Sequence, residues 1–259
     1  MKIWYQSAAS LHNLSSYSTT LESHAKAAAA PHTVDIFGTP PGVHTSRNPK
    51  DHVGYSYLQT LHAEQFIGAA LRAEREGYDA YFVGTIPDIG YEDIRTLVDI
   101  PVVAFGHASY LFAAMLGNVI GIVNFVDAVN PLLRRNALKY GFSDMLGPIV
   151  NIETTLDSVA SSYDKPDGMI SSFKVAARTA IEQGADVIIP GPGPLNVMLA
   201  GQGINEIDGV PIVDSVGVGM KFCVMRAEMK TPTSRRGYYN AKPPMEIVEE
   251  LRSLYFKGV

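Results

Sequence analysis

Two stretches of the chain repeat the same arrangement of helix, glycine and buried strand. Residues 69–85 read AALRAEREGYDAYFVGT, and residues 176–192 read AARTAIEQGADVIIPGP. In each copy a helical segment ends at a glycine, an apolar strand follows an aspartate, and a glycine-containing turn comes next. A similar closing strand then follows, at residues 100–103 and 210–213. Any α/β protein can show such units by chance, but the matched spacing favours two halves in a pseudo-symmetric relation.

Short apolar runs alternate with segments of helical periodicity, which is the pattern of a parallel sheet. The sequence therefore predicts the α/β class, with Gly77 and Gly184 ending two of the helices. The predicted strands cover residues 2–5, 33–37, 80–83, 102–105, 119–125, 187–190 and 212–213. The clearest predicted helices cover residues 58–76, 171–183, 216–228 and 245–254.

Composition narrows the class of protein. A chain of 259 residues, 46% hydrophobic and 18% charged, can form one large or two ordinary globular domains. A net charge of -5 without long charged blocks argues against a nucleic-acid partner. The first residues do not resemble a signal segment, and glycine and asparagine interrupt the apolar stretch 110–126. We therefore expect a cytoplasmic protein without a membrane partner.

The turns after the two repeated strands hold equivalent positions. Open parallel sheets bind ligands beyond the carboxyl ends of their strands, so Thr85 and Pro192 should lie at the mouths of two half-sites. A substrate can then bind between them. Cys223 is the one cysteine of the sequence, which excludes an intrachain disulfide and a multi-cysteine metal site.

Several segments, in order, carry a resemblance to a known family: the first strand leading to Gln6 and Ser7, then EGYDAYFVGTIPDIG, VDIPVVAFGHAS, GADVIIPGPGPLN and GVPIVDSVGVGMKF. Together they resemble the aspartate/glutamate racemase superfamily, most closely its hydantoin racemase-like branch. The resemblance implies two pseudo-symmetric Rossmann-like domains with parallel sheets and an active site in the cleft between them. The implied domains are residues 1–106 with 214–259, and residues 107–213.

Racemases of this family place one cysteine on each face of the substrate carbon. The matching positions here are Thr85 and Pro192, with Gly84 as the alternative to Thr85. Threonine is not a stable base at neutral pH, and proline has no proton to exchange, so the two-thiol mechanism is excluded. Cys223 lies in the apolar stretch GMKFCVM, where a buried packing role is expected.

Three residues are candidates for catalysis: His107, Thr85 and Asp88. His107 directly follows the strand PVVAFG and is either a general base or a residue that caps the next helix. Asp88 could transfer a proton if burial raises its pKa, although a role as N-cap of the helical segment 91–97 is favoured. The same caution applies to Asp214.

Substrate contacts are expected from the strand ends and from the long loop 38–55, which is rich in glycine, proline and histidine. Backbone N–H groups of the turns can hold a carboxylate or a developing enolate oxygen. His44 is a further candidate, but the histidines lack metal-ligand spacing, so no metal site is predicted. The predicted substrate-binding residues are Gln6, Ser7, His52, Tyr55, Gly84, Ile86, Gly191, Pro192 and Gly193.

These observations favour a cofactor-independent enzyme acting at the carbon next to a carboxylate or amide carbonyl, with acid and base groups other than cysteine. The expected substrate is a small carboxylate or cyclic amide. A decarboxylase or ring-opening hydrolase on the same scaffold is one alternative, and a non-catalytic carboxylate-binding protein is another. The arginine- and tyrosine-containing stretch 231–259 predicts packing on a neighbouring subunit, and hence a homo-oligomer, although packing on the first domain would give the same pattern.

Overall fold

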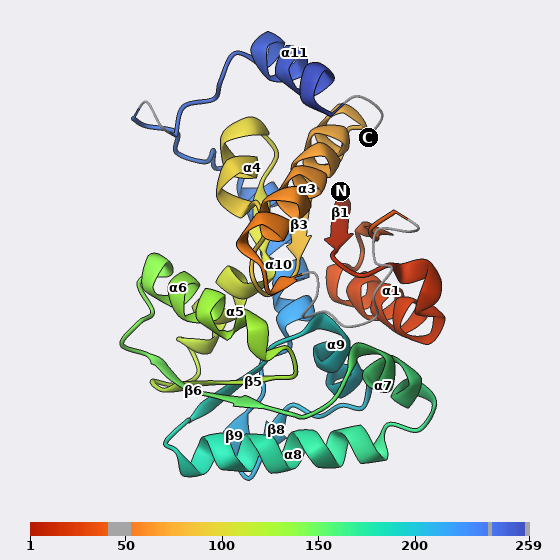
Figure 1. Ribbon diagram of the computed structural model, residues 1–259, viewed down its shortest axis with the longest axis vertical. Coiled ribbons are helices and arrows are strands. Elements are labelled where there is room, and N and C mark those ends of the chain that lie inside the picture. Colours follow the sequence, from red (N-terminus) through yellow and green to blue (C-terminus); the bar gives the residue numbers. More distant parts are fainter. Residues whose placement is uncertain (41–52, 238–239, 257–259) are drawn as a thin grey trace.

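The first part of the chain forms a parallel four-stranded sheet of order β2-β1-β3-β4 (Figure 1). The computed structural model describes residues 1–40, 53–237 and 240–256. The strands are β1 (Lys2–Ser7), β2 (Thr33–Phe37), β3 (Ala80–Gly84) and β4 (Val102–Ala104). Helices α3 (Ser56–Arg75) and α4 (Tyr91–Leu97) contact this sheet, as do α1 (Ser15–Ala29) and α10 (Ser215–Met229).

The second part forms a parallel three-stranded sheet of order β6-β5-β7. Ile188 of β7 also forms an isolated parallel bridge with Ile212, which places a fourth extended segment beyond β7. The strands are β5 (Ile120–Asn124), β6 (Leu146–Asn151) and β7 (Val187–Pro190), and a separate hairpin joins β8 (Glu206–Ile207) to β9 (Val210–Pro211). The remaining helices are α5 (Phe105–Ala113), α6 (Asn130–Tyr140), α7 (Leu156–Ser161), α8 (Asp167–Glu182), α9 (Gly193–Gly201) and α11 (Met245–Tyr255), with short 3-10 turns η1 (Leu11–Asn13), η2 (Asp127–Val129) and η3 (Ser162–Asp164).

The two sheets are built in the same order. β1 and β5 hold equivalent places: β2 and β6 follow them in sequence and pair on one side, and β3 and β7 pair on the other. The repeated units of the sequence are α3 with β3 and α8 with β7, and both helices are followed by a glycine of positive φ, Gly77 and Gly184. The predicted α/β class with parallel sheets is confirmed.

Side chains of β1 alternate between two apolar clusters, because successive residues of a strand point to opposite faces. Ile3 and Tyr5 join the larger cluster, which continues through the second sheet. Trp4 points to the face covered by α3, where it stacks on Phe37 with ring centroids 3.7 Å apart. By the same alternation Ser7 lies on the face of Tyr5, where β1 ends.

Helix α10 carries the chain from the second sheet back to the first. It packs on α1, α5 and β3, and Asp214 begins it by accepting a hydrogen bond from the backbone N–H of Gly217. Gly219 is required at the contact with β3, because a Cβ atom there would overlap the ring of Phe82. Cys223 is fully buried in this helix, and burial raises the pKa of its thiol. The packing role expected for this cysteine agrees with its position.

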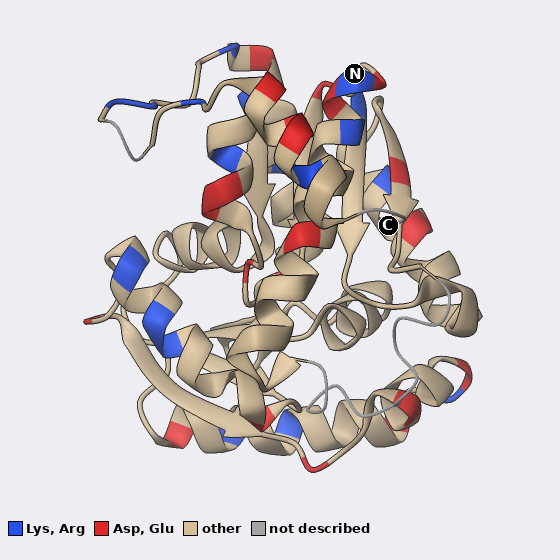
Figure 2. Cartoon of the chain, turned by 45° about the horizontal axis from the view of Figure 1, so that its top comes forward, with Lys and Arg blue, Asp and Glu red and all other residues tan. Residues whose placement is uncertain are grey.

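Charged residues are spread over both halves of the chain, with Lys and Arg interspersed among Asp and Glu (Figure 2). Helix α11 lies at the far end of the first sheet and is tied to α3 by an ion pair between Arg252 and Glu64 (Figure 1). Within residues 1–40, 53–237 and 240–256, no helix combines the length and apolar character needed to cross a bilayer. The domain boundaries implied by the resemblance stay a prediction.

Candidate active site

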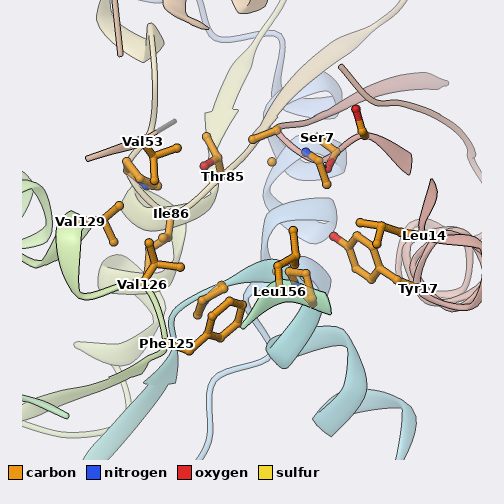
Figure 3. A pocket seen from close by; sticks show the side chains of 18 of the residues that line it. Ser7, Leu14, Tyr17, Val53, Thr85, Ile86, Phe125, Val126, Val129 and Leu156 are labelled. Carbon is orange, nitrogen blue, oxygen red and sulfur yellow. The ribbon is translucent and has the colours of Figure 1, made fainter. Parts of the chain in front are cut away.

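A cavity of about 580 Å³ lies where the strands of the two sheets end (Figure 3). Segments following β1, β3, β5 and β7 form its wall, together with the start of α1 and of α7. Volumes of this size are typical of sites for small molecules. The lining residues are Ser7, Ala8, Ala9, Ser10, Asn13, Leu14, Tyr17, Val53, Gly84, Thr85, Ile86, Pro87, Asn124, Phe125, Val126, Val129, Leu156, Asp157, Pro192, Gly193 and Pro194.

Half of the predicted catalytic and substrate-binding residues line this cavity. The turns after β3 and β7 both reach it, so the equivalence of Thr85 and Pro192 inferred from the internal repeat holds in space. The parallel strands bring these turns together because their carboxyl ends face the same space. The predicted residues that line the cavity are Ser7, Gly84, Thr85, Ile86, Pro192 and Gly193.

Gly84 cannot carry a side chain in this fold. A Cβ atom there would overlap the ring of Tyr5 and would approach the backbone oxygen of Gln6 to 2.7 Å. Thr85 is therefore the first residue after β3 whose side chain can enter the cavity. This geometry favours Thr85 over Gly84 as the position that corresponds to the first cysteine of the family.

Hydrogen-bond donors of the cavity come from both halves. Among the described residues the Thr85 hydroxyl forms no hydrogen bond, so it remains available to a ligand. On the other side Gly193 begins α9, and the N-cap residue Pro192 provides no side-chain cap. An uncapped helix start presents backbone N–H groups and a positive dipole end, which together favour an anionic or carbonyl oxygen.

The polar side chains at the ends of β5 and β1, Asn124 and Ser7, differ in what they can offer a ligand. The amide of Asn124 is fully engaged with its own loop: its oxygen accepts from the N–H groups of Phe125 and Val126, and its nitrogen donates to the Val126 oxygen at 2.8 Å and to Asn130. The Ser7 hydroxyl accepts from the N–H of Ala9 at 3.1 Å, which leaves its own proton free to donate.

The two sides of the cavity differ in polarity. Val53, Ile86, Val126 and Val129 gather on one side, and Tyr17 lies opposite them with Ser7 and Leu14 (Figure 3). Such an apolar side suits a hydrocarbon substituent of a ligand, while the hydroxyl side suits its polar group.

Three predicted substrate-binding residues do not line the cavity: Gln6, Tyr55 and Gly191. Gln6 is buried and bonds to the indole N–H of Trp4 and, through its own amide nitrogen, to the backbone oxygens of Ser7 and Gly38. Tyr55 is exposed at the start of α3, outside the lining. Gly191 donates its backbone N–H to the oxygen of Val123 and continues the sheet. His44 and His52 lie outside the described residues.

Asp88 caps a helix, but the helix is α5 and not the expected segment 91–97. It adopts a left-handed conformation with φ 54° and accepts hydrogen bonds from the N–H groups of Gly106 and His107, at 2.7 and 2.8 Å, and from the Tyr140 hydroxyl at 2.9 Å. It thus caps α5, whereas Gly90 precedes α4 without a side-chain cap. Burial raises the pKa of the Asp88 carboxyl to about 7, against the opposing effect of these three donors.

His107 follows this cap and does not line the cavity. Because Asp88 binds the N–H groups at residues 106 and 107, α5 begins at Phe105, so that His107 lies within the helix and does not cap it. The His107 Nδ1 atom lies 3.0 Å from the Tyr91 hydroxyl, and its ring packs on Tyr140 with centroids 4.4 Å apart. Burial lowers the pKa of His107 to about 4, so the imidazole is neutral at pH 7. Its predicted role as a base stays a prediction, which this position does not favour.

Replacing Asp88 by asparagine is expected to lower the free energy of unfolding by about 1–3 kcal/mol. Asparagine tolerates the left-handed conformation, but its amide has one oxygen in place of two, so a buried N–H of α5 loses its acceptor. Chemical denaturation measures the change. Asp208→Asn is the matched control, because Asp208 has φ 52° in an exposed turn and has no cap to lose, only a solvent-screened ion pair with Arg178. Equal stability of the Asp88 variant and the wild type would contradict the capping role.

The same variant should also change how stability depends on pH. Between about pH 4 and 7 the folded Asp88 holds a proton that the unfolded chain has released, so its contribution to stability falls as pH rises. His107 acts oppositely: the unfolded chain binds a proton below about pH 6.5 that the folded chain does not, so stability is lost as pH falls. The two effects oppose each other in the wild type. In Asp88→Asn only that of His107 remains, and denaturation between about pH 4 and 6.5 should show stability rising more steeply with pH.

Several lining residues could not be assigned from the sequence alone. Tyr17 and Asp157 are the titratable side chains among the lining residues of the described part of the chain. One feature of the sequence could have indicated Asn124: it ends β5 as Ser7 ends β1, and the two strands hold equivalent places in the two sheets. No feature of the sequence indicated Tyr17, because the irregular segment 8–14 leads into α1 and its path depends on long-range contacts.

Residues 13–223 match the family described as Asp/Glu/Hydantoin racemase. The chain belongs to this family. It is 25% identical over 198 residues to a hydantoin racemase from Pseudomonas sp. (strain NS671), covering 76% of this chain and 78% of the relative. Its fold is similar to that of an allantoin racemase from Klebsiella pneumoniae, with a TM-score of 0.74, 20% identity and 94% of both chains covered.

A variant of arylmalonate decarboxylase in a sulfate-associated form also shares the fold, with a TM-score of 0.58, 15% identity, and 92% and 97% of the two chains covered. These likenesses establish the two-domain Asp/Glu racemase fold for this chain. Proteins with different named reactions share this architecture.

Proposed function

We propose that this chain is an enzyme that acts at the carbon next to a carboxylate or amide carbonyl of a small substrate, without a thiol and without a cofactor. The observation that carries the proposal is the cavity itself, formed at the strand ends of both halves in a member of the racemase family. Its Thr85 hydroxyl and the uncapped start of α9 face a common space. That arrangement suits a reaction that passes through an enolate.

The chemistry needs stabilisation of the oxygen that becomes negative as the carbon is deprotonated or loses a carboxylate. The Thr85 hydroxyl and the backbone N–H of Gly193 are the proposed donors, one from each half of the fold. A donor placed in advance toward a developing oxyanion contributes about 3–4 kcal/mol in a site shielded from water. The apolar side formed by Val53, Ile86, Val126 and Val129 would hold the substituent on the reacting carbon.

Proton transfer must use groups other than thiols. Thr85 and Pro192 occupy the two positions where cysteines of the family are expected, and Cys223 is buried in α10. Catalytic roles for His107 and Asp88 are also proposed, but both residues lie outside the cavity lining. The proposed proton donors of the reaction are therefore residues that line the cavity.

A second candidate function is loss of carbon dioxide from the same carbon. Racemisation requires one group to remove a proton and another to return it, whereas decarboxylation requires a single proton to be delivered. Tyr17 and Asp157 are the titratable lining residues in the described part of the chain, and Tyr17 is neutral in its buried setting. A neutral Tyr17 can supply that single proton, which supports decarboxylation as the second candidate, with ring opening as the third alternative.

Proton NMR in deuterated water tests the proposal directly, with a panel of 5-substituted hydantoins, amino acids, arylmalonates and small lactams. Exchange of the proton on the carbon next to the carbonyl, without loss of substrate, supports racemase-type chemistry. Release of carbon dioxide or an opened ring assigns the chain to lyases or hydrolases. A panel that binds in calorimetry but shows no exchange and no product contradicts an enzymatic role and favours the binding protein.

A further inference from the structure

The Tyr17 hydroxyl occupies the half-site in which Pro192 provides no proton. Tyr17 lies in the first turns of α1, is 2% exposed, and points its hydroxyl into the cavity (Figure 3). Its oxygen lies 3.1 Å from the place where a Cβ atom at Gly193 would stand. The phenol therefore covers the turn after β7, across the cavity from the turn that carries Thr85.

The setting of Tyr17 holds it firmly in this place. Tyr163, whose hydroxyl donates to the backbone oxygen of Pro194 at 2.6 Å, packs on its ring with centroids 5.8 Å apart. The hydroxyls of Tyr5 and Ser7 adjoin its own. The Tyr5 hydroxyl is completely buried, and no hydrogen bond of good geometry satisfies it within the described structure. A buried polar atom without a partner is costly and rare in native structures, and a catalytic role is one of its explanations.

The protonation state of Tyr17 follows from its burial. Removal from water raises the pKa of its phenol well above the ordinary value, and the neighbouring hydroxyls of Ser7 and Tyr5 offset this only in part. The side chain therefore carries its proton at neutral pH. A neutral phenol is a hydrogen-bond donor and a proton source, and it is not a base in the resting enzyme.

We propose that Tyr17 is the acid of the second half-site and delivers its hydroxyl proton to the carbon that has lost a proton or a carboxylate. This assignment rests on the proposed function of the cavity. The new C–H bond forms as the O–H bond of Tyr17 breaks, and the phenolate takes its next proton from water. While charged, the phenolate accepts hydrogen bonds from Ser7 and Tyr5, which gives the otherwise unsatisfied Tyr5 hydroxyl a partner.

Tyr17→Phe removes the proton and keeps the ring. For any panel compound that the wild type converts, kcat should fall by about 10²–10⁴-fold, the range for loss of a general acid. KM should change by less than about threefold, because the group acts in the transition state rather than in binding. Tyr81→Phe is the matched control: Tyr81 is fully buried, donates its hydroxyl to the backbone oxygen of Phe66 at 2.9 Å, and does not line the cavity. It should leave kcat unchanged.

A second measurement separates this inference from the proposed function. The measurement is ¹³C NMR of protein labelled at the tyrosine Cζ atoms, in which the resonance missing from Tyr17→Phe identifies Tyr17. The ligands added as probes are 5-phenylhydantoin and phenylmalonate. A shifted Tyr17 resonance without turnover supports its place in the ligand site and contradicts the proposed reaction. Turnover that survives in Tyr17→Phe with kcat close to that of the wild type overturns the acid. A Tyr17 resonance that neither probe moves overturns it as well.

Discussion

Thr85→Val is expected to lower kcat/KM by about 10²–10³-fold toward any substrate that the wild type converts, the cost of losing one oxyanion donor. Valine has the shape of threonine, so the turn after β3 keeps its packing while the hydroxyl on the cavity wall is lost. The same substitution at Thr179 of α8, whose hydroxyl donates to the backbone oxygen of Val175, is the control and should leave activity unchanged. Enzyme kinetics and a thermal unfolding curve measure both variants.

The pattern of kinetic constants decides what Thr85 does. If its hydroxyl stabilises charge that develops during the reaction, kcat falls and KM stays close to the wild-type value. If it only binds substrate, KM rises and kcat is retained. Full activity of Thr85→Val would remove Thr85 from the mechanism and would leave the backbone N–H of Gly193 as the proposed oxyanion donor.

Gly84→Ala is expected to lower the free energy of unfolding by about 3 kcal/mol, at the upper end of the range for overpacking a core. The added methyl group would meet the ring of Tyr5 and the backbone oxygen of Gln6, and both belong to the fully or nearly fully buried first strand. Neither neighbour can withdraw without moving β1, so the cavity wall at Ser7 should shift and activity should be lost as well. Chemical denaturation measures the first effect.

Gly168→Ala is the matched control for this substitution. Gly168 lies in the first turn of α8, and nothing stands within 4 Å of the position of its added Cβ atom. Alanine should be tolerated there without loss, since it has the higher helix propensity. A Gly84 variant as stable as the wild type would mean that β1 and β3 can separate slightly, and that position 84 can carry a side chain as position 85 does.

The fold could be predicted from the sequence where its signals are local. Glycine stops and apolar runs recur in both halves, and β3, β7, α3 and α8 lie where this repeat places them. β6 was missed because Leu146–Asn151 contains glycine and proline, which argue against a strand interior. It is an edge strand of the second sheet, where proline is tolerated. Helix α1 was missed because its first turns are rich in serine and threonine, which are poor helix formers.

The candidate site was predictable to the extent that strand ends define it. Thr85 and Pro192 follow directly from the repeat and the rule for parallel sheets. His107 was placed toward the cavity because the sequence gives no sign that Asp88, in a preceding turn, would cap α5 and rotate its start. Tyr17 depends on how α1 packs across the turn after β7, a contact between segments far apart in the chain.

The position of Trp4 allows the unfolding of the first sheet to be followed apart from that of the whole molecule. It is the one tryptophan of the chain, it is 1% exposed, and it packs on Phe37 in the first sheet. Intrinsic fluorescence excited at the indole band therefore reports on the first sheet alone, whereas far-ultraviolet circular dichroism reports on the helices of both halves. If both signals change at the same denaturant concentration, the halves unfold as one cooperative unit, and two separate midpoints would reveal a partly folded intermediate.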